Sequence, residues 1–147
     1  MIEAEIDQRR LLVLDTHTLV WMVNKSARLG ATTSTALDEA SFEDQLAISA
    51  ITPWEVALLV SKRRLTLNSD VMNWVNEALA KPGVTLVALE PEIAVASTRL
   101  PFEMHADPAD RILVATARHL GATLVTADRA LLELAKSGHF RAMDATL

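Results

Sequence analysis

Apolar and polar residues follow one another along the chain in blocks that predict strands and helices in turn. Short, unbroken apolar runs are typical of strands that are buried on both faces of a sheet. Such runs lie at 11–14, 46–48, 84–89 and 122–125, and 140–143 has the pattern of a short last strand. The segments between them have the residue spacing of helices. This alternation predicts βαβ units and a mostly parallel sheet that is covered by helices on both sides.

Capping residues and helix stops indicate where some of the helices begin and end. Thr52-Pro53 predicts a helix start, with the Thr52 hydroxyl as the cap and the proline at the first helical position. Thr32 or Thr33 is expected to cap the helix before it. Gly121 is expected to close the helix that precedes the fourth strand, because glycine adopts the left-handed conformation at helix ends without strain.

The composition bounds the class of protein. Half of the residues are apolar and 22% are charged, and no linker, internal repeat or low-complexity segment interrupts the chain, so we expect 1–147 to form a single domain. The absence of cysteine excludes disulfides, thiolate zinc sites and thiol nucleophiles. No stretch approaches the roughly 20 apolar residues that span a bilayer, and residues 1–10 lack the apolar core of a signal peptide. We therefore expect a cytoplasmic protein without a membrane segment.

The net charge limits how this protein could bind a nucleic acid. It is −5 at pH 7, whereas a protein that holds nucleic acid by charge alone is usually basic. If RNA is the substrate, local basic groups and bound cations must attract it. A surplus of carboxylates also suits a protein that captures divalent metal ions.

Four carboxylates are expected at the carboxyl-terminal edge of the predicted sheet. Asp15 directly follows the first strand, and Asp128 lies three residues after the end of the fourth. Glu55 and Asp110 lie in the first turns of two other helices, and all four are expected at the edge where the carboxyl ends of the strands meet. Grouped carboxylates repel one another unless a cation neutralises them, and Mg²⁺ and Mn²⁺ prefer oxygen ligands. Such an ion can activate water and stabilise charge on a phosphodiester, so phosphodiester cleavage is the chemistry that fits best.

Each of these carboxylates also has a structural interpretation. Asp15 and Asp128 are favoured helix caps, and Glu55 and Asp110 suit the positive end of a helix dipole. Asp107, which stands before a proline as a cap does, is assigned to structure. The functional interpretation rests on four such residues falling on one edge of the sheet.

Several basic side chains are candidates for contacting substrate phosphates. They are Arg111, Arg129, His17, Lys62, Arg63 and Arg64. The alternatives are surface ion pairs for the first two, a structural hydrogen bond for the histidine, and a solvated helix end for the run of three.

Four segments of the sequence, taken together, resemble the PIN-domain proteins. They are 15–21 (DTHTLVW), 54–55 (WE), 105–115 (HADPADRILVA) and 124–128 (LVTAD). The resemblance extends over roughly residues 11–145 and points in particular to the VapC-type toxin ribonucleases of type II toxin–antitoxin systems. Ala109 is a departure, since the family commonly has phenylalanine there.

The resemblance implies a three-layer α/β/α sandwich and an endoribonuclease that depends on Mg²⁺ or Mn²⁺. It carries Asp15, Glu55, Asp110 and Asp128 over as the acidic residues that hold the metal, and Thr126 as an auxiliary hydroxyl near it. It also implies a homodimer that cleaves RNA, is inhibited by a cognate antitoxin and meets operator DNA only through that antitoxin.

Two other functions stay open at this stage. One is another metal-dependent phosphoryl hydrolase, although an aspartyl-phosphate phosphatase would carry a second aspartate two positions after Asp15, where this chain has His17. The other is a catalytically inactive PIN-like interaction module. A pure scaffold, however, has no need of four carboxylates that repel one another.

Overall fold

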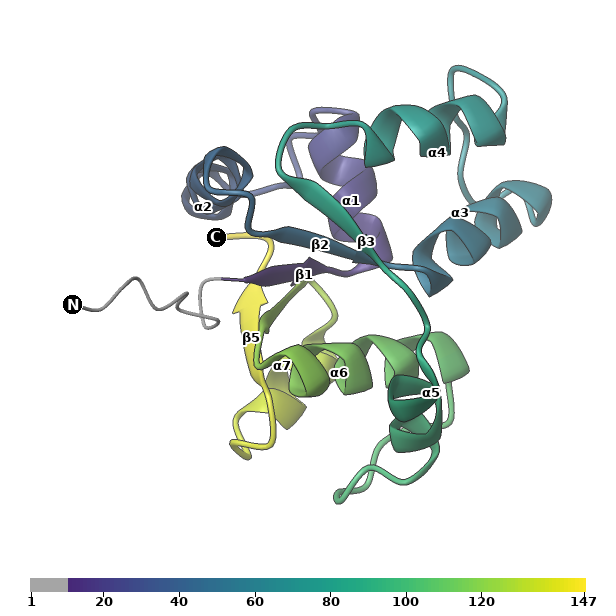
Figure 1. Cartoon of the computed structure of the whole chain (residues 1–147). Helices are drawn as coiled ribbons and strands as arrows, with labels where there is room; N and C mark the ends of the chain where they lie inside the picture. Colours follow the sequence, from purple (N-terminus) through teal and green to yellow (C-terminus); the bar gives the residue numbers. More distant parts are fainter. Residues whose placement is uncertain (1–10) are drawn as a thin grey trace.

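A computed structural model describes residues 11–147 of the chain. The prediction about a signal peptide concerns residues 1–10 and lies outside the described part. Within that part, strands and helices alternate as the sequence pattern predicted (Figure 1).

The described strands form one sheet in which every neighbouring pair is parallel. They are β1 (Leu12–Leu14), β2 (Leu46–Ser49), β3 (Val84–Val87), β4 (Thr123–Thr126) and β5 (Arg141–Asp144). Their order across the sheet is β3-β2-β1-β4-β5, so the first strand of the chain lies at the centre. Val13 of β1 pairs with Ala47 of β2 on one side and with Leu124 of β4 on the other. The predicted parallel sheet is therefore confirmed.

Helices cover both faces of this sheet. They are α1 (Thr16–Val23), α2 (Ala31–Phe42), α3 (Ile51–Ser61), α4 (Val71–Leu79), α5 (Pro91–Thr98), α6 (Pro108–Leu120) and α7 (Arg129–Ala135). Figure 1 shows α1 to α4 on one face and α5 to α7 on the other, which is the expected α/β/α sandwich. No helix within residues 11–147 combines the length and the apolar character that crossing a lipid bilayer requires.

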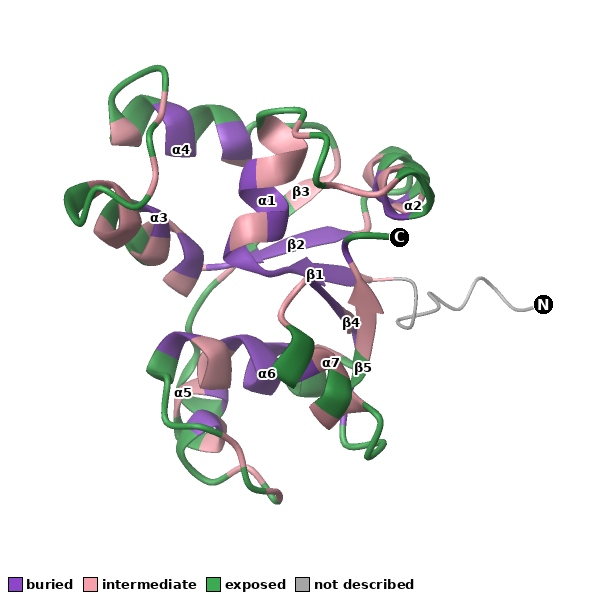
Figure 2. Ribbon diagram, turned by 180° about the vertical axis from the view of Figure 1, so that it is seen from behind, coloured by how far each residue is buried: buried purple, intermediate pink, exposed green. Residues whose placement is uncertain are grey.

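The central strand explains how the sheet holds its two layers of helices. Leu12 and Leu14 contribute to the apolar cluster beneath α1 to α4, and Val13 to the cluster beneath α6 and α7. Successive side chains of a strand point to opposite faces, so an unbroken apolar run serves both cores. Figure 2 shows β1 and β2 as buried. A strand packed in this way fixes the position of the residue that follows it, Asp15.

The predicted cap of α3 is wrong. The helix begins at Ile51, before Thr52, and the Ser49 hydroxyl accepts a hydrogen bond from the Ile51 backbone N–H at 3.1 Å. Pro53 therefore stands at the third helical position, where its missing N–H is still harmless. Thr52 is fully buried, and its hydroxyl is the buried side-chain atom of the described residues that finds no hydrogen-bond partner.

The predicted cap of α2 is also wrong. Gly30 occupies the capping position, and no side chain caps the helix. The Thr33 hydroxyl donates instead to the carbonyl of Asp144, because the chain after β5 packs against this helix end. A Cβ at Gly30 would lie 2.0 Å from the carbonyl oxygen of Leu147, so this close approach requires glycine.

Candidate active site

Asp15 lies at the carboxyl end of β1 and is 4% exposed. One carboxylate oxygen, Oδ1, accepts a hydrogen bond from the Thr16 backbone N–H at 2.7 Å at the start of α1. The other, Oδ2, accepts one from the Thr126 hydroxyl of β4 at 2.7 Å. Asp15 is thus both the helix cap and a member of the group of carboxylates, and the two interpretations of its role are compatible.

Thr126 joins two of the predicted carboxylates. It ends β4 and is fully buried, and its hydroxyl oxygen accepts a hydrogen bond from the Asp128 backbone N–H at 3.0 Å. Asp128 caps α7 through a hydrogen bond from the Leu131 N–H to its Oδ1 at 3.1 Å. The Thr126 hydroxyl therefore binds the carboxylate of Asp15 and, through the Asp128 backbone N–H, the turn that carries Asp128.

Glu55 reaches the same region from a different helix. It is the fifth residue of α3 and lies in the second turn, one turn later than predicted, because the helix starts earlier. Its Oε1 accepts a hydrogen bond from the Thr16 hydroxyl at 2.5 Å. Burial raises the pKa of Glu55 above its ordinary value, the bond from Thr16 lowers it in part, and the charges of Asp15 and Asp107 raise it further.

Asp110 stands in the strongest field of negative charge. It lies in the first turn of α6, as predicted. Burial, followed by the charges of Asp15, Asp107, Glu55 and Asp128, raises the pKa of Asp110 from 3.8 to about 7. Thr16 links Asp15 to Glu55, Thr126 links Asp15 to the turn of Asp128, and all three charges act on Asp110, so the four carboxylates lie around the same end of the sheet.

The arrangement fits a divalent cation in charge and in donor chemistry. Among residues 11–147, however, no group of three or more histidine or carboxylate side chains is set closely enough to hold one ion together. Oδ1 of Asp110 and Oε2 of Glu55 accept no hydrogen bond from any described residue and are available as ligands. The donor set suits an ion that binds one or two carboxylates directly and the others through its waters, as Mg²⁺ commonly does.

Two histidines lie beside these carboxylates. Nε2 of His17 accepts a hydrogen bond from the Ala127 backbone N–H at 2.8 Å, and its Nδ1 lies 3.6 Å from Asp15 Oδ2. That ring therefore ties α1 to the turn after β4, which favours the structural interpretation over phosphate contact. His105 places Nε2 at 3.4 Å from Asp110 Oδ2.

Arg111, a candidate for phosphate contact, donates hydrogen bonds to backbone carbonyls of the chain. Its Nε donates to the Ser97 carbonyl at 2.8 Å, and its Nη1 donates to the carbonyls of Met104 and His105. The guanidinium thereby connects α6 by hydrogen bonds to α5 and to the loop between the two helices. Asp107 also has its predicted structural role, since its Oδ1 caps α6 by accepting from the Ala109 and Asp110 N–H groups.

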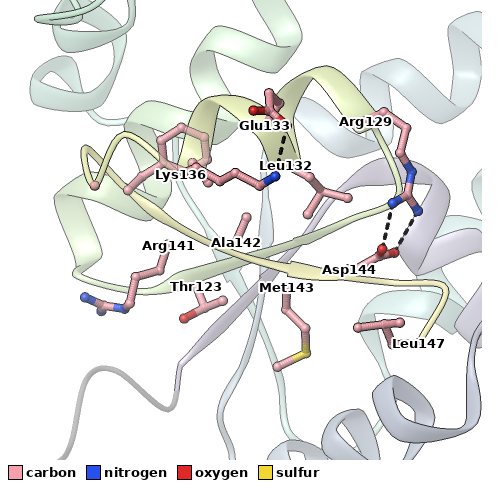
Figure 3. Close-up of a pocket in the computed structure, with 13 residues that line it drawn as sticks. Thr123, Arg129, Leu132, Glu133, Lys136, Arg141, Ala142, Met143, Asp144 and Leu147 are labelled. Atoms are coloured by element: carbon pink, nitrogen blue, oxygen red, sulfur yellow. Dashed lines mark hydrogen bonds and ion pairs between the residues drawn. The ribbon is translucent and has the colours of Figure 1, made fainter.

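Arg129 is likewise engaged in structure. Its two terminal nitrogens donate to the two carboxylate oxygens of Asp144 at 2.8 and 3.0 Å (Figure 3). This bidentate pair lines a cavity of about 850 Å³ between α7 and β5, where Lys136 also pairs with Glu133 at 3.1 Å. None of the four predicted carboxylates lines that cavity. Both carboxylates of its lining, Glu133 and Asp144, are paired with cations, and Arg141 adds a further positive charge, so it lacks the cluster of unpaired carboxylates of the predicted site.

The basic run Lys62, Arg63 and Arg64 follows the end of α3 and is exposed. None of the three forms an ion pair with a described residue. Lys62 is seven residues beyond Glu55, about 10 Å along the helix axis. The structure therefore keeps this run outside the carboxylate group but leaves it open to a long polyanion.

The residue that the sequence interpretation missed is Thr16. It lies beside Asp15 in the chain, but its contact with Glu55 spans 39 positions. No local pattern in the sequence indicates such a contact.

The chain was also compared with known proteins. The family model described as PIN domain matches residues 12–137. Ribonuclease VapC22 of Mycobacterium tuberculosis is 37% identical over 120 residues, which cover 82% of this chain and 88% of that protein.

Solved structures with the same fold include proteins from three bacteria. VapBC2 from Rickettsia felis, bound to a DNA fragment from its promoter, gives a TM-score of 0.68 at 18% identity and covers 91% of this chain and 98% of that chain. DNA-bound VapBC from Salmonella typhimurium gives 0.66 at 16% identity, with 91% and 97% covered. FitAcB from Neisseria gonorrhoeae gives 0.63 at 21% identity, with 92% and 98% covered. At these identities the likeness concerns the fold alone.

Proposed function

Because this chain belongs to the PIN-domain family, we propose that it is an endoribonuclease that requires Mg²⁺ or Mn²⁺ and acts as the toxin of a type II toxin–antitoxin system. The relative at 37% identity is named a ribonuclease, which supports RNA as the substrate. The proposal includes a cytoplasmic location, where RNA and a cognate antitoxin are both present.

The observation that carries this proposal is the surplus of negative charge around Asp110. Four other carboxylates act on it, and its pKa rises to about 7. No lysine or arginine among residues 11–147 pairs with any of the five. A purely structural site would replace or neutralise such charges, whereas a site for a divalent cation needs them.

Asp15, Glu55, Asp110 and Asp128 are the residues that would hold the metal. When bound, the ion supplies a more acidic water and a positive charge beside the phosphate. Thr126 orients Asp15 through its hydroxyl, so that carboxylate does not have to reorganise when the ion enters. A bound cation would favour the ionised form of Asp110, whose pKa is raised to about 7 in the chain alone.

The reaction is a hydrolysis. The oxygen of a water molecule forms a bond to phosphorus, and the bond from phosphorus to the leaving ribose oxygen breaks. The attacking water loses a proton and the leaving oxygen gains one.

Among the candidates for holding the RNA backbone, Lys62, Arg63 and Arg64 stay in the proposal, whereas Arg111 and Arg129 have structural partners.

We extend the proposal to the partners. The similar structures carry the names of complexes, VapBC and FitAcB, and two of them contain DNA. By analogy, this chain would form a homodimer, bind a cognate antitoxin and meet DNA only through that antitoxin.

Metal binding is the direct test. At a hundred times its dissociation constant, an ion that binds only the folded chain adds about 2.7 kcal/mol of stability. We expect Mn²⁺ to raise the melting temperature of the EDTA-treated protein by about 5–10 °C and to restore RNA cleavage. An unchanged melting temperature without cleavage would favour the inactive module. Metal-dependent cleavage of a small phosphate ester but not of RNA would favour another phosphoryl hydrolase.

Growth of a bacterial host tests the toxin assignment. Expression of the wild-type chain without an antitoxin is expected to slow growth, while Asp110→Asn at equal protein level is not. Growth arrest by the Asp110→Asn variant would contradict RNA cleavage as the cause of toxicity.

A further inference from the structure

Thr16 is a buried hydroxyl residue at the first position of α1, and it touches two of the four carboxylates. Its backbone N–H donates to Asp15 Oδ1 at 2.7 Å, and its side-chain hydroxyl donates to Glu55 Oε1 at 2.5 Å. Thr16 therefore contacts both Asp15, at the end of β1, and Glu55, on α3.

Glu55 depends on such a contact more than Asp15 and Asp128 do. Those two aspartates accept hydrogen bonds from backbone N–H groups at the starts of α1 and α7. Glu55 has one more side-chain torsion than an aspartate and accepts no backbone hydrogen bond from the described residues. Among residues 11–147, Thr16 is the one hydrogen-bond donor to its carboxylate.

The hydroxyl of Thr16 is well placed to restrict this side chain. Threonine is branched at Cβ, so few rotamers are open to it in a helix, and its hydroxyl often returns to a carbonyl one turn earlier. Here its one proton is directed to Glu55 Oε1 instead. Oε2 of the same carboxylate accepts no hydrogen bond within residues 11–147, so it stays available to a ligand.

We propose that Thr16 is a positioning residue for the metal centre, whose hydroxyl holds the Glu55 carboxylate with one oxygen bound and the other presented to the divalent ion. This inference rests on the proposed function, because it assigns Glu55 to that ion. Thr16 thus does for Glu55 what Thr126 does for Asp15.

Substitution of Thr16 tests this role with Mn²⁺ as the probe. Thr16→Val keeps the shape but removes the hydroxyl, and Thr16→Ser keeps the hydroxyl. By isothermal titration, we expect Thr16→Val to bind Mn²⁺ about tenfold more weakly. Thr16→Ser is expected to stay close to the wild type. RNA cleavage at saturating RNA is expected to fall in the same order at limiting Mn²⁺.

Thr116→Val is the matched control. Thr116 is a buried threonine whose hydroxyl donates to the Ile112 carbonyl of its own helix, α6, and to no carboxylate. Its substitution removes the same atoms and is expected to lower thermal stability without changing Mn²⁺ affinity. Equal weakening of Mn²⁺ binding by Thr116→Val and Thr16→Val would overturn the specific role of Thr16.

A double-mutant cycle with Glu55→Ala shows whether Thr16 acts through Glu55. In that background, removing the hydroxyl is expected to leave Mn²⁺ affinity unchanged, because no carboxylate remains to be positioned. Thr16→Ala replaces Thr16→Val in the cycle should the valine variant not fold. A full, additive loss in the Glu55→Ala background would overturn the proposal.

The failure of this inference is distinguishable from that of the proposed function. If the wild type binds Mn²⁺ and cleaves RNA, and Thr16→Val does both equally well, only the role of Thr16 is wrong. If the wild type binds no Mn²⁺, the metal-dependent function is wrong and the role of Thr16 with it.

Discussion

Two aspartates near the same edge of the sheet behave in opposite ways. Asp144 ends β5, and its partial burial raises its pKa. Hydrogen bonds from Arg129 and Thr146, together with the charge of Arg129, outweigh this effect and lower the pKa to about 2. Asp110, in the first turn of α6, has its pKa raised to about 7 by burial and by neighbouring carboxylates. The pKa of an aspartate is therefore lowered beside Arg129 and raised among the carboxylates around Asp110.

The two regions differ in whether the chain itself supplies the opposite charge for the aspartate. Around Asp144, the opposite charge is supplied by the chain itself, in a bidentate pair. Around Asp110, like charges accumulate and the described chain offers no lysine or arginine to balance them. Strongly shifted acids without a built-in counter-charge are typical of functional sites, whereas paired ones are typical of structure.

The same substitution in the two regions is expected to change RNA cleavage very differently. Asp110→Asn is expected to lower RNA cleavage at least about 1000-fold, because it removes a metal-binding charge while keeping the side-chain volume. Asp144→Asn makes the same chemical change in the other region and is expected to cleave RNA at a rate close to the wild type. Initial rates on purified RNA with Mg²⁺, after circular dichroism confirms folding, give the comparison. Equal rates for the two variants would erase the distinction between the regions.

The next effect concerns pH and the metal-free protein. The folded pKa of Asp110 lies above its ordinary value, so its contribution to stability is fully present below about pH 4 and is lost as pH rises through about 7. Between pH 5 and 8, we expect the metal-free wild type to lose about 2 kcal/mol more stability than Asp110→Asn, allowing for solvent screening.

Urea unfolding in EDTA at several pH values measures this loss, and Asp110→Asn is its control. Addition of Mn²⁺ at pH 8 is expected to restore the stability of the wild type but not that of the variant, because the ion favours the ionised carboxylate. A wild type whose stability follows the same pH curve as the variant would show that Asp110 ionises normally.

The smallest effect concerns the paired aspartate. The folded pKa of Asp144 lies below its ordinary value, so its contribution is present above about pH 4 and is lost as pH falls through about 2. Because Arg129 is mostly exposed, Asp144→Asn is expected to cost about 1 kcal/mol at neutral pH. Urea unfolding at pH 7 and at pH 3 tests this, and a loss that grows at pH 3 would contradict the ion pair as its source.

Much of the site was predictable because strand ends are local features. The apolar runs located β1 and β4, and the parallel arrangement brought the residues that follow them, Asp15 and Asp128, to one edge. The position of Asp110 followed from Asp107-Pro108, a helix start that the structure retains. Glu55 was placed one turn too early, since Ser49 rather than Thr52 supports the start of α3.

The partners of polar side chains were beyond prediction. Arg111 and Arg129 follow carboxylates in the sequence, as phosphate-binding residues would, yet the fold directs them to loop carbonyls and to Asp144. Thr33 was expected to cap its own helix and instead donates its hydroxyl to a carbonyl 111 positions away. Such choices depend on which groups come within hydrogen-bond distance after folding.

The order of elements, the parallel sheet and the edge that carries the carboxylates follow from apolar periodicity and helix-start residues, which act over a few positions of the chain. Folding was needed to place Asp110 among other carboxylates, Asp144 beside Arg129, and Thr16 beside Glu55. These outcomes depend on contacts between residues that are far apart in the sequence. Burial and pairing are properties of neighbours in space, and the packing of helices onto the sheet brings those neighbours together from distant parts of the chain.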